Sequence, residues 1–79
     1  MDKNLTVYPI STGDQLNVFA ADDISRICVM DMAGNVLANA DGVSGKQNIL
    51  DIRHLPGATY IVEVTFQNHK TGRSVFVKM

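Results

Sequence analysis

The sequence is built from short runs of alternating polar and apolar residues separated by turn-forming residues, and no segment of useful length has helical periodicity. Alternation with period two places every second side chain on one face, which is typical of β-strands buried on one side. The runs recur roughly every 8–12 residues, a spacing typical of an all-β sandwich or barrel. The sequence therefore predicts about seven strands, over residues 5–8, 15–19, 25–31, 36–40, 47–52, 60–66 and 74–79.

The connections between these runs are too short for parallel neighbours, which need crossovers of a dozen or more residues. We therefore expect an all-β fold, a small immunoglobulin-like antiparallel β-sandwich, as a single domain over residues 5–79. Residues 1–4 are expected to be a disordered start or a remnant of cloning. With 79 residues, of which 46% are hydrophobic, the chain can form one modest core. The apolar faces predict this core as Leu16, Val18, Ile27, Val29, Leu50, Ile52, Leu55, Tyr60, Val62, Val64, Val75 and Val77.

Two local features carry sharper expectations. The segment from Asp31 to Asn35 predicts a tight hairpin turn, in which Gly34 takes a positive φ and Asp31 accepts backbone N–H groups. Cys28 lies within an apolar run and is predicted to be buried and unreactive. As the single cysteine of the chain, it can form no intrachain disulfide.

Candidate catalytic and metal-ligating residues are few, and none forms a convincing group. His54 and His69 lie in predicted turns beside basic neighbours, which repel cations. Asp22 and Asp23 are adjacent on an extended segment, so their side chains point to opposite faces. The pair Asp41-Gly42 matches a fragment of a calcium loop but lacks the Asp-x-Asp-x-Asp-Gly spacing. We therefore expect no catalytic residue, no cofactor and no bound metal.

Charge and hydropathy exclude further classes of function. The net charge is −1 and the seven basic residues are scattered, which disfavours binding to nucleic acid or to an anionic membrane surface. No run approaches the 18 apolar residues typical of a membrane-spanning helix, so membrane insertion is not expected. The residues alone thus indicate a small β-sandwich that binds a partner or is bound by one.

The order of short motifs adds a resemblance to a known family. The segments are Val7-Tyr8-Pro9, then residues 13–18, 27–36, 51–56 and 60–64, and finally Val77-Lys78. Together they resemble the C-terminal sorting domain of type IX secretion cargo in Bacteroidetes, also known as the Por secretion system. That family's pattern is Tyr-Pro-Asn-Pro, Asp-x-x-Gly-Lys/Arg-Val, Asp-Leu-Ser-x-Leu-x-x-Gly-x-Tyr and a closing lysine. The matching positions, which we call the motif positions, are Tyr8, Pro9, Asp31, Gly34, Asp51, Leu55, Gly57, Tyr60 and Lys78.

The matching positions also have expected physical roles. Pro9 cannot donate a ladder hydrogen bond and should end the first strand. Leu55 is expected to plug one end of the core, and Tyr60 to begin the central strand with a large ring and a polar tip. The sequence departs from the family pattern where Ile10-Ser11 follows the first proline, and Gly57 stands one position before the family's usual glycine.

The resemblance implies a non-catalytic sorting module at the end of a larger secreted protein, located outside the cell or on the outer-membrane surface. Its implied partners are the secretion machinery and a sortase-like peptidase at the outer membrane. Such recognition is expected to read exposed strand edges and turns, here the C-terminal strand. The alternatives are an accessory immunoglobulin-like structural or binding module of a secreted protein, and a free-standing intracellular protein. The oligomeric state is not predicted.

Overall fold

The computed structural model describes residues 5–9, 13–41 and 45–79, and the expected start over residues 1–4 lies outside the described residues. Within these ranges the chain forms seven strands and no helix, which confirms the predicted fold class. Accordingly, the described residues contain no helix that could cross a membrane. The strands are β1 (Leu5–Pro9), β2 (Gln15–Ala20), β3 (Ile24–Met30), β4 (Val36–Asp41), β5 (Gln47–Asp51), β6 (Ala58–Phe66) and β7 (Thr71–Lys78).

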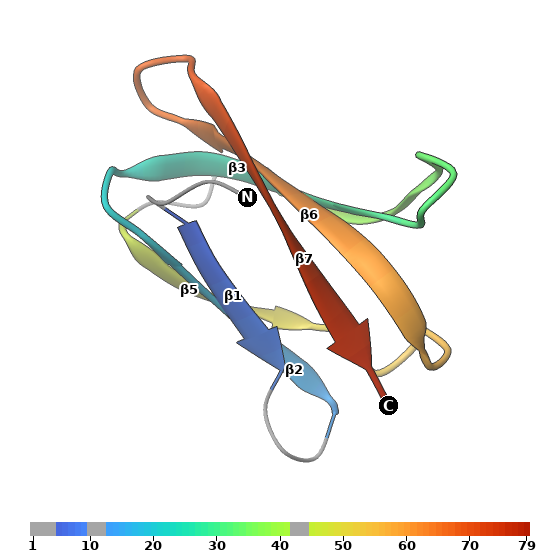
Figure 1. Cartoon of the computed structure of the whole chain (residues 1–79). Helices are drawn as coiled ribbons and strands as arrows, with labels where there is room; N and C mark the ends of the chain where they lie inside the picture. The colour runs from blue at the N-terminus through green and yellow to red at the C-terminus, as the bar shows by residue number, and fades with distance from the viewer. Residues whose placement is uncertain (1–4, 10–12, 42–44) are drawn as a thin grey trace.

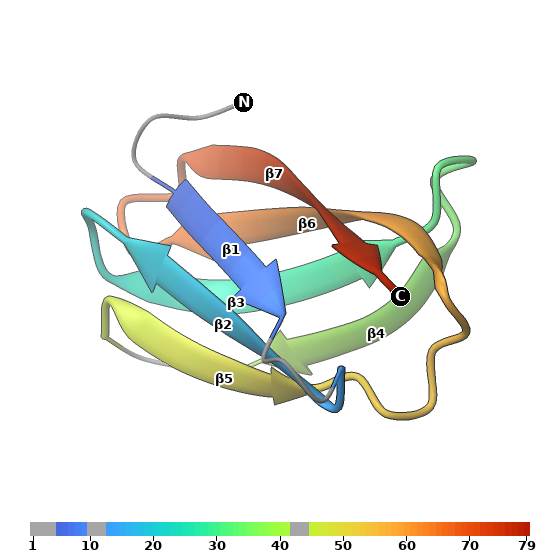
Figure 2. The same ribbon diagram turned by 60° about the horizontal axis from the view of Figure 1, so that its bottom comes forward.

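The strands form two antiparallel sheets packed face to face (Figure 1). One sheet has the order β1-β2-β5 and the other β4-β3-β6-β7. The chain passes from one sheet to the other between β2 and β3, between β4 and β5, and between β5 and β6. Two antiparallel sheets connected in this way are typical of immunoglobulin-like sandwiches. The edge strands β1 and β7 of the two sheets lie side by side (Figure 2). The expected pairing of the longest strand with the C-terminal strand is confirmed, from Ala58↔Lys78 to Thr65↔Thr71.

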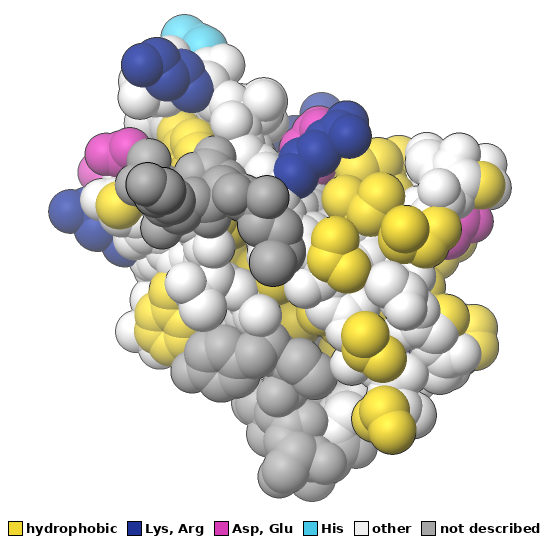
Figure 3. All heavy atoms as spheres, viewed as in Figure 1, with side chains coloured by type: hydrophobic (Ala, Val, Ile, Leu, Met, Phe, Trp, Pro, Cys, Tyr) yellow, Lys and Arg dark blue, Asp and Glu magenta, His cyan; other side chains and the backbone are white. Residues whose placement is uncertain are grey.

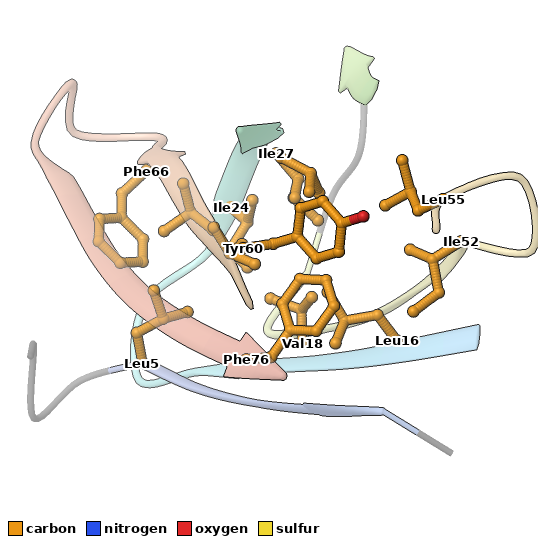
Figure 4. Close-up of a cluster of buried hydrophobic side chains, with 13 residues drawn as sticks. Leu5, Leu16, Val18, Ile24, Ile27, Ile52, Leu55, Tyr60, Phe66 and Phe76 are labelled. Atoms are coloured by element: carbon orange, nitrogen blue, oxygen red, sulfur yellow. The ribbon is translucent and has the colours of Figure 1, made fainter. Parts of the chain in front are cut away.

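The core between the sheets is formed by the inward faces of the strands. Figure 4 shows Tyr60 in its middle, with the ring of Phe76 beside it and Leu55 near one end. The two rings stack with their centroids 5.4 Å apart. Most of the predicted core is confirmed, and Leu50 is half-buried against it. Five large residues outside the predicted set are also buried, namely Leu5, Ile24, Met30, Phe66 and Phe76.

The predicted orientation of the last strand was wrong. Val75 and Val77 are 41% and 52% exposed, whereas Ser74 and Phe76 face the core. Residues directly paired across a ladder share a face, and Phe76 pairs with Tyr60 while Ser74 pairs with Val62. Since Tyr60 and Val62 are buried, their partners must point inward too. The large ring of Phe76 supplies the apolar surface that the two valines were expected to supply.

The prediction for Cys28 was also wrong in part. Its side chain is half-buried rather than buried, and it pairs with Glu63 and Asn39 on the outer face of the larger sheet. Its neighbours Ile27 and Val29 are the residues that face the core. The alternation places Cys28 on the other side of the sheet from them.

Candidate functional site

The strand register brings the motif positions to one end of the sandwich, which we call the motif end. Pro9 closes β1, Asp31 follows β3, and Asp51 closes β5 at its pairing with Gln15. Ala58 begins β6 opposite Lys78, the last residue of β7. Four connections or termini that are distant in sequence therefore lie at this end. The opposite end holds the start of β1 and the turn between β6 and β7.

The first motif forms its β-strand as expected. Tyr8 pairs with Asn17 and Pro9 with Leu16, and β1 ends at Pro9. Proline has no N–H to donate to a ladder, so it is tolerated at the last position of this strand.

Asp31 organises the turn between β3 and β4. Its Oδ1 accepts hydrogen bonds from the backbone N–H groups of Ala33 and Asn35, both at 2.9 Å. Its Oδ2 accepts one from the Asn35 side-chain amide at 3.0 Å. Gly34 has φ 91°, a left-handed conformation that glycine adopts without strain. The predicted turn is confirmed. The Asn35 side chain, followed by its backbone N–H, holds the pKa of the Asp31 carboxyl below its usual value.

Asp51 plays the same part at the end of β5. Its Oδ1 accepts from the backbone N–H of Arg53 at 3.0 Å, and its Oδ2 lies 2.9 Å from Nη2 of the Arg53 guanidinium. The guanidinium, followed by the backbone N–H, lowers the pKa of Asp51 to about 2. Arg53 and Asp51 are both exposed, so the pair orders the turn rather than the core.

Leu55 and Tyr60 close the core at this end. Leu55 is buried, and its N–H donates to the carbonyl of Ile52 at 3.0 Å, which holds the turn against the sheets. The Tyr60 hydroxyl donates to the carbonyl of Pro56, four residues upstream. A tyrosine near the start of this strand, bonded back to upstream backbone, is the tyrosine corner of immunoglobulin-like sandwiches. The Tyr60 ring thus packs in the core, and its hydroxyl bonds to the carbonyl of Pro56.

Lys78 ties the end of the chain to the same turn. Its amine donates to the carbonyls of Ile52 at 2.7 Å, Arg53 at 3.3 Å and Leu55 at 2.5 Å. This role has no local signal in the sequence, because it joins residues 23 to 26 positions apart. A lysine facing three carbonyl oxygens satisfies all three ammonium donors.

Gly57 makes room for this closure. A Cβ on Gly57 would lie 3.3 Å from the carbonyl oxygen of Lys78 and 3.3 Å from the carbonyl carbon of Met79. Both atoms belong to the backbone, so neither can easily move aside. A glycine therefore allows the turn before β6 to approach the last residues of β7.

The polar motif side chains at the motif end are engaged within the domain itself. Asp31, Asp51, Tyr60 and Lys78 each bond to the domain's own backbone, and the two aspartates also bond to the side chains of Asn35 and Arg53. Among the described residues, no three His, Cys, Asp or Glu side chains come close enough to hold a metal ion. His54 and His69 lie in exposed turns, and His69 adopts a left-handed φ of 70°.

The polar motif side chains of this small β-sandwich thus order one end of the fold. A family model described as "Secretion system C-terminal sorting domain" matches residues 6–78. The chain belongs to this family, and the domain is a C-terminal sorting signal for type IX secretion. No match to a curated protein was found. Membership implies a secreted or cell-surface protein that interacts with the type IX machinery, and it supports sorting over the accessory-module alternative.

Proposed function

We propose that the folded domain is a non-catalytic address that the type IX machinery reads at the outer membrane, before a sortase-like peptidase removes it from its passenger. The observation that supports this proposal most is the convergence of the motif positions on one end. Asp31, Asp51, Tyr60 and Lys78 bond there to backbone that the motifs themselves contribute. The nine motif positions are thus proposed to preserve a folded signal.

The C-terminal strand is central to this proposal. β7 is an edge strand of the larger sheet, and it pairs with β6 along eight residue positions from Lys78 to Thr71. It also carries Phe76 into the core and Lys78 onto the turn before β6. Loss of this strand would therefore destroy both the surface and the fold that the machinery reads.

The sorting proposal is tested by fusing residues 1–79 behind a signal peptide and a passenger in a cell with a type IX system. We expect the passenger outside the cell, and we expect it in the periplasm when residues 74–79 are deleted. Val62→Ala serves as the control for lost stability, because Val62 is buried but lies outside the motif positions. An intact, folded fusion that stays in the periplasm contradicts the proposal.

The peptidase step is tested on the same secreted passenger by mass spectrometry. Removal of the sorting domain predicts a passenger that ends before Leu5. A secreted passenger that still carries residues 5–79 would contradict removal by a peptidase, while secretion itself would still support the sorting signal.

A further inference from the structure

The outer face of the larger sheet carries an apolar strip that the core does not use. Direct pairing aligns Val36 with Met30, Met30 with Ile61, and Ile61 with Val75, so that one row crosses all four strands. We call Val36, Met30, Ile61 and Val75 the outer apolar row. Val36 is 55% exposed and Val75 41%, while Met30 is buried at 9%. Val77 extends the row at 52%. Hydrophobic side chains gather on this side of the molecule in Figure 3, where β6 and β7 lie in Figure 1.

The same face becomes polar toward the opposite end. The next row along β6 and β7 is the ion pair of Glu63 and Arg73, with 2.7 Å between Oε2 and Nε. On the neighbouring strands, Arg26 and Asp41 form a second pair at 3.1 Å. An apolar centre bordered by polar and charged groups is typical of protein-binding surfaces rather than of a face left to solvent.

The position of the row indicates which partner covers it. In a C-terminal sorting domain the passenger joins ahead of β1, and Leu5 pairs with Ala20 at the end opposite the motif end. The outer apolar row lies toward the motif end, because Val75 is three residues before Lys78. The passenger thus enters away from the row and leaves it accessible.

A second copy of the chain is a weaker candidate. The exposed parts of three valines and one isoleucine amount to an area on the order of a few hundred Å², whereas a stable interface buries about 800 Å² on each partner. A patch of this size is suited to a transient complex with another protein. The outer edge of β7 is a less suitable docking point, since β1 already lies beside it.

We infer that the outer apolar row, with Val77, is the surface by which the domain docks on a protein of the secretion machinery that presents aliphatic side chains. This inference rests on the proposed sorting function and names the face through which it operates. The ion pairs Glu63–Arg73 and Arg26–Asp41 form the polar rim on one side of the contact.

The test compares substitutions at two positions on the same strand and the same face, in the secreted fusion. Val75→Lys places a charge in the outer apolar row and should lower secretion about tenfold or more, as expected for a central apolar contact. Thr71→Lys adds the same side chain at the polar end and should leave secretion unchanged. Val75→Thr keeps the shape of valine and should give a smaller loss. The purified domains must retain wild-type unfolding midpoints, which the exposure of Val75 and Thr71 predicts.

The outcomes separate the two proposals. If the wild-type fusion is not secreted, the sorting function itself fails. If it is secreted and folded Val75→Lys is secreted equally well, the docking surface is wrong and the sorting function stands. A purified wild-type domain that is a dimer, and that Val75→Lys converts to a monomer, would overturn the inference in favour of a second copy. Equal losses for Thr71→Lys and Val75→Lys would also overturn it.

Discussion

The two ends of the sandwich are closed by different kinds of interaction. At the motif end, charged side chains bond to backbone: Asp31 and Asp51 accept from N–H groups, and Lys78 donates to carbonyls. At the opposite end, the backbone of Phe66 donates to the carbonyl of Lys70 at 2.8 Å, and the side chains that bond to backbone are neutral. The Oδ1 of Asn68, for example, accepts from the N–H of Lys70 at 3.0 Å.

This contrast explains why the family pattern is concentrated at one end. Charge-assisted hydrogen bonds require particular side chains, and each can be lost through one substitution. Backbone pairing tolerates many sequences, and the side chains of Ser25, Gln67 and Asn68 that bond to backbone at the opposite end are uncharged. We therefore expect the motif positions to maintain the closed end of the domain, and the outer face to make the contacts with its partner.

The largest expected effect is the loss of the core plug at the motif end. Leu55→Ala should lower the free energy of unfolding by about 2–5 kcal/mol, because Leu55 is buried and the remaining cavity cannot fully collapse. Chemical denaturation measures the change, with the exposed Met32→Ala as the control. A loss below about 0.5 kcal/mol would show that this end of the core does not depend on Leu55.

Removing the amine of Lys78 should have the next largest effect. Lys78→Met keeps an apolar stem but leaves the carbonyls of Ile52, Arg53 and Leu55 without this donor. We expect a loss of about 1–3 kcal/mol, the usual range for part-buried polar groups left unsatisfied. The same substitution at the exposed Lys46 is the control, and equal stability of the two variants would contradict the role given to Lys78.

Gly34→Val isolates the backbone contribution of the turn after β3. No atom lies within 4 Å of a Cβ placed on Gly34, so the cost comes from its φ of 91° and amounts to about 1–2 kcal/mol. Ala33→Val, one residue earlier in the same exposed turn, should be nearly neutral. Thermal unfolding of both variants tests the assignment, which two equal melting temperatures would refute.

The smallest expected effect is on the loss of stability at low pH. The pKa of Asp51 is about 2 in the folded domain against an ordinary 3.8, so its ionised form is favoured by folding. This contribution is fully present above about pH 3.8 and is lost as the pH falls toward 2. Asp51→Asn should therefore flatten the fall of the melting temperature between pH 4 and pH 2. Identical slopes for the variant and the wild type would show that the Arg53 pair does not act in solution.

The strands and the Asp31 turn could be predicted because both are local. Alternation marks a strand within five to nine residues, and Asp31 reaches its partners within four residues. Alternation does not say which face is buried when both carry apolar residues, and this is why Val75 and Val77 were placed in the core. The pairing of Phe76 with Tyr60 decides the matter, and it becomes visible only once β6 and β7 are aligned.

The candidate site could be predicted as a set of residues but not as an arrangement. The resemblance identified Asp51, Leu55, Gly57 and Lys78 one by one. Their meeting depends on the pairing of Ala58 with Lys78 and on a turn that approaches the last strand closely. The outer apolar row is likewise invisible in the sequence, because its four members come from four strands.

The central claim is that the motif positions act through the fold and the outer face acts through contact. The most direct test measures secretion of the passenger against the free energy of unfolding for Leu55→Ala, Lys78→Met and the buried, non-motif control Val62→Ala. We predict that these three variants fall on one curve, and that Val75→Lys falls well below it at wild-type stability. Secretion of Lys78→Met or Leu55→Ala far below that of Val62→Ala at equal stability would contradict the account, because the machinery would then contact the motif positions themselves.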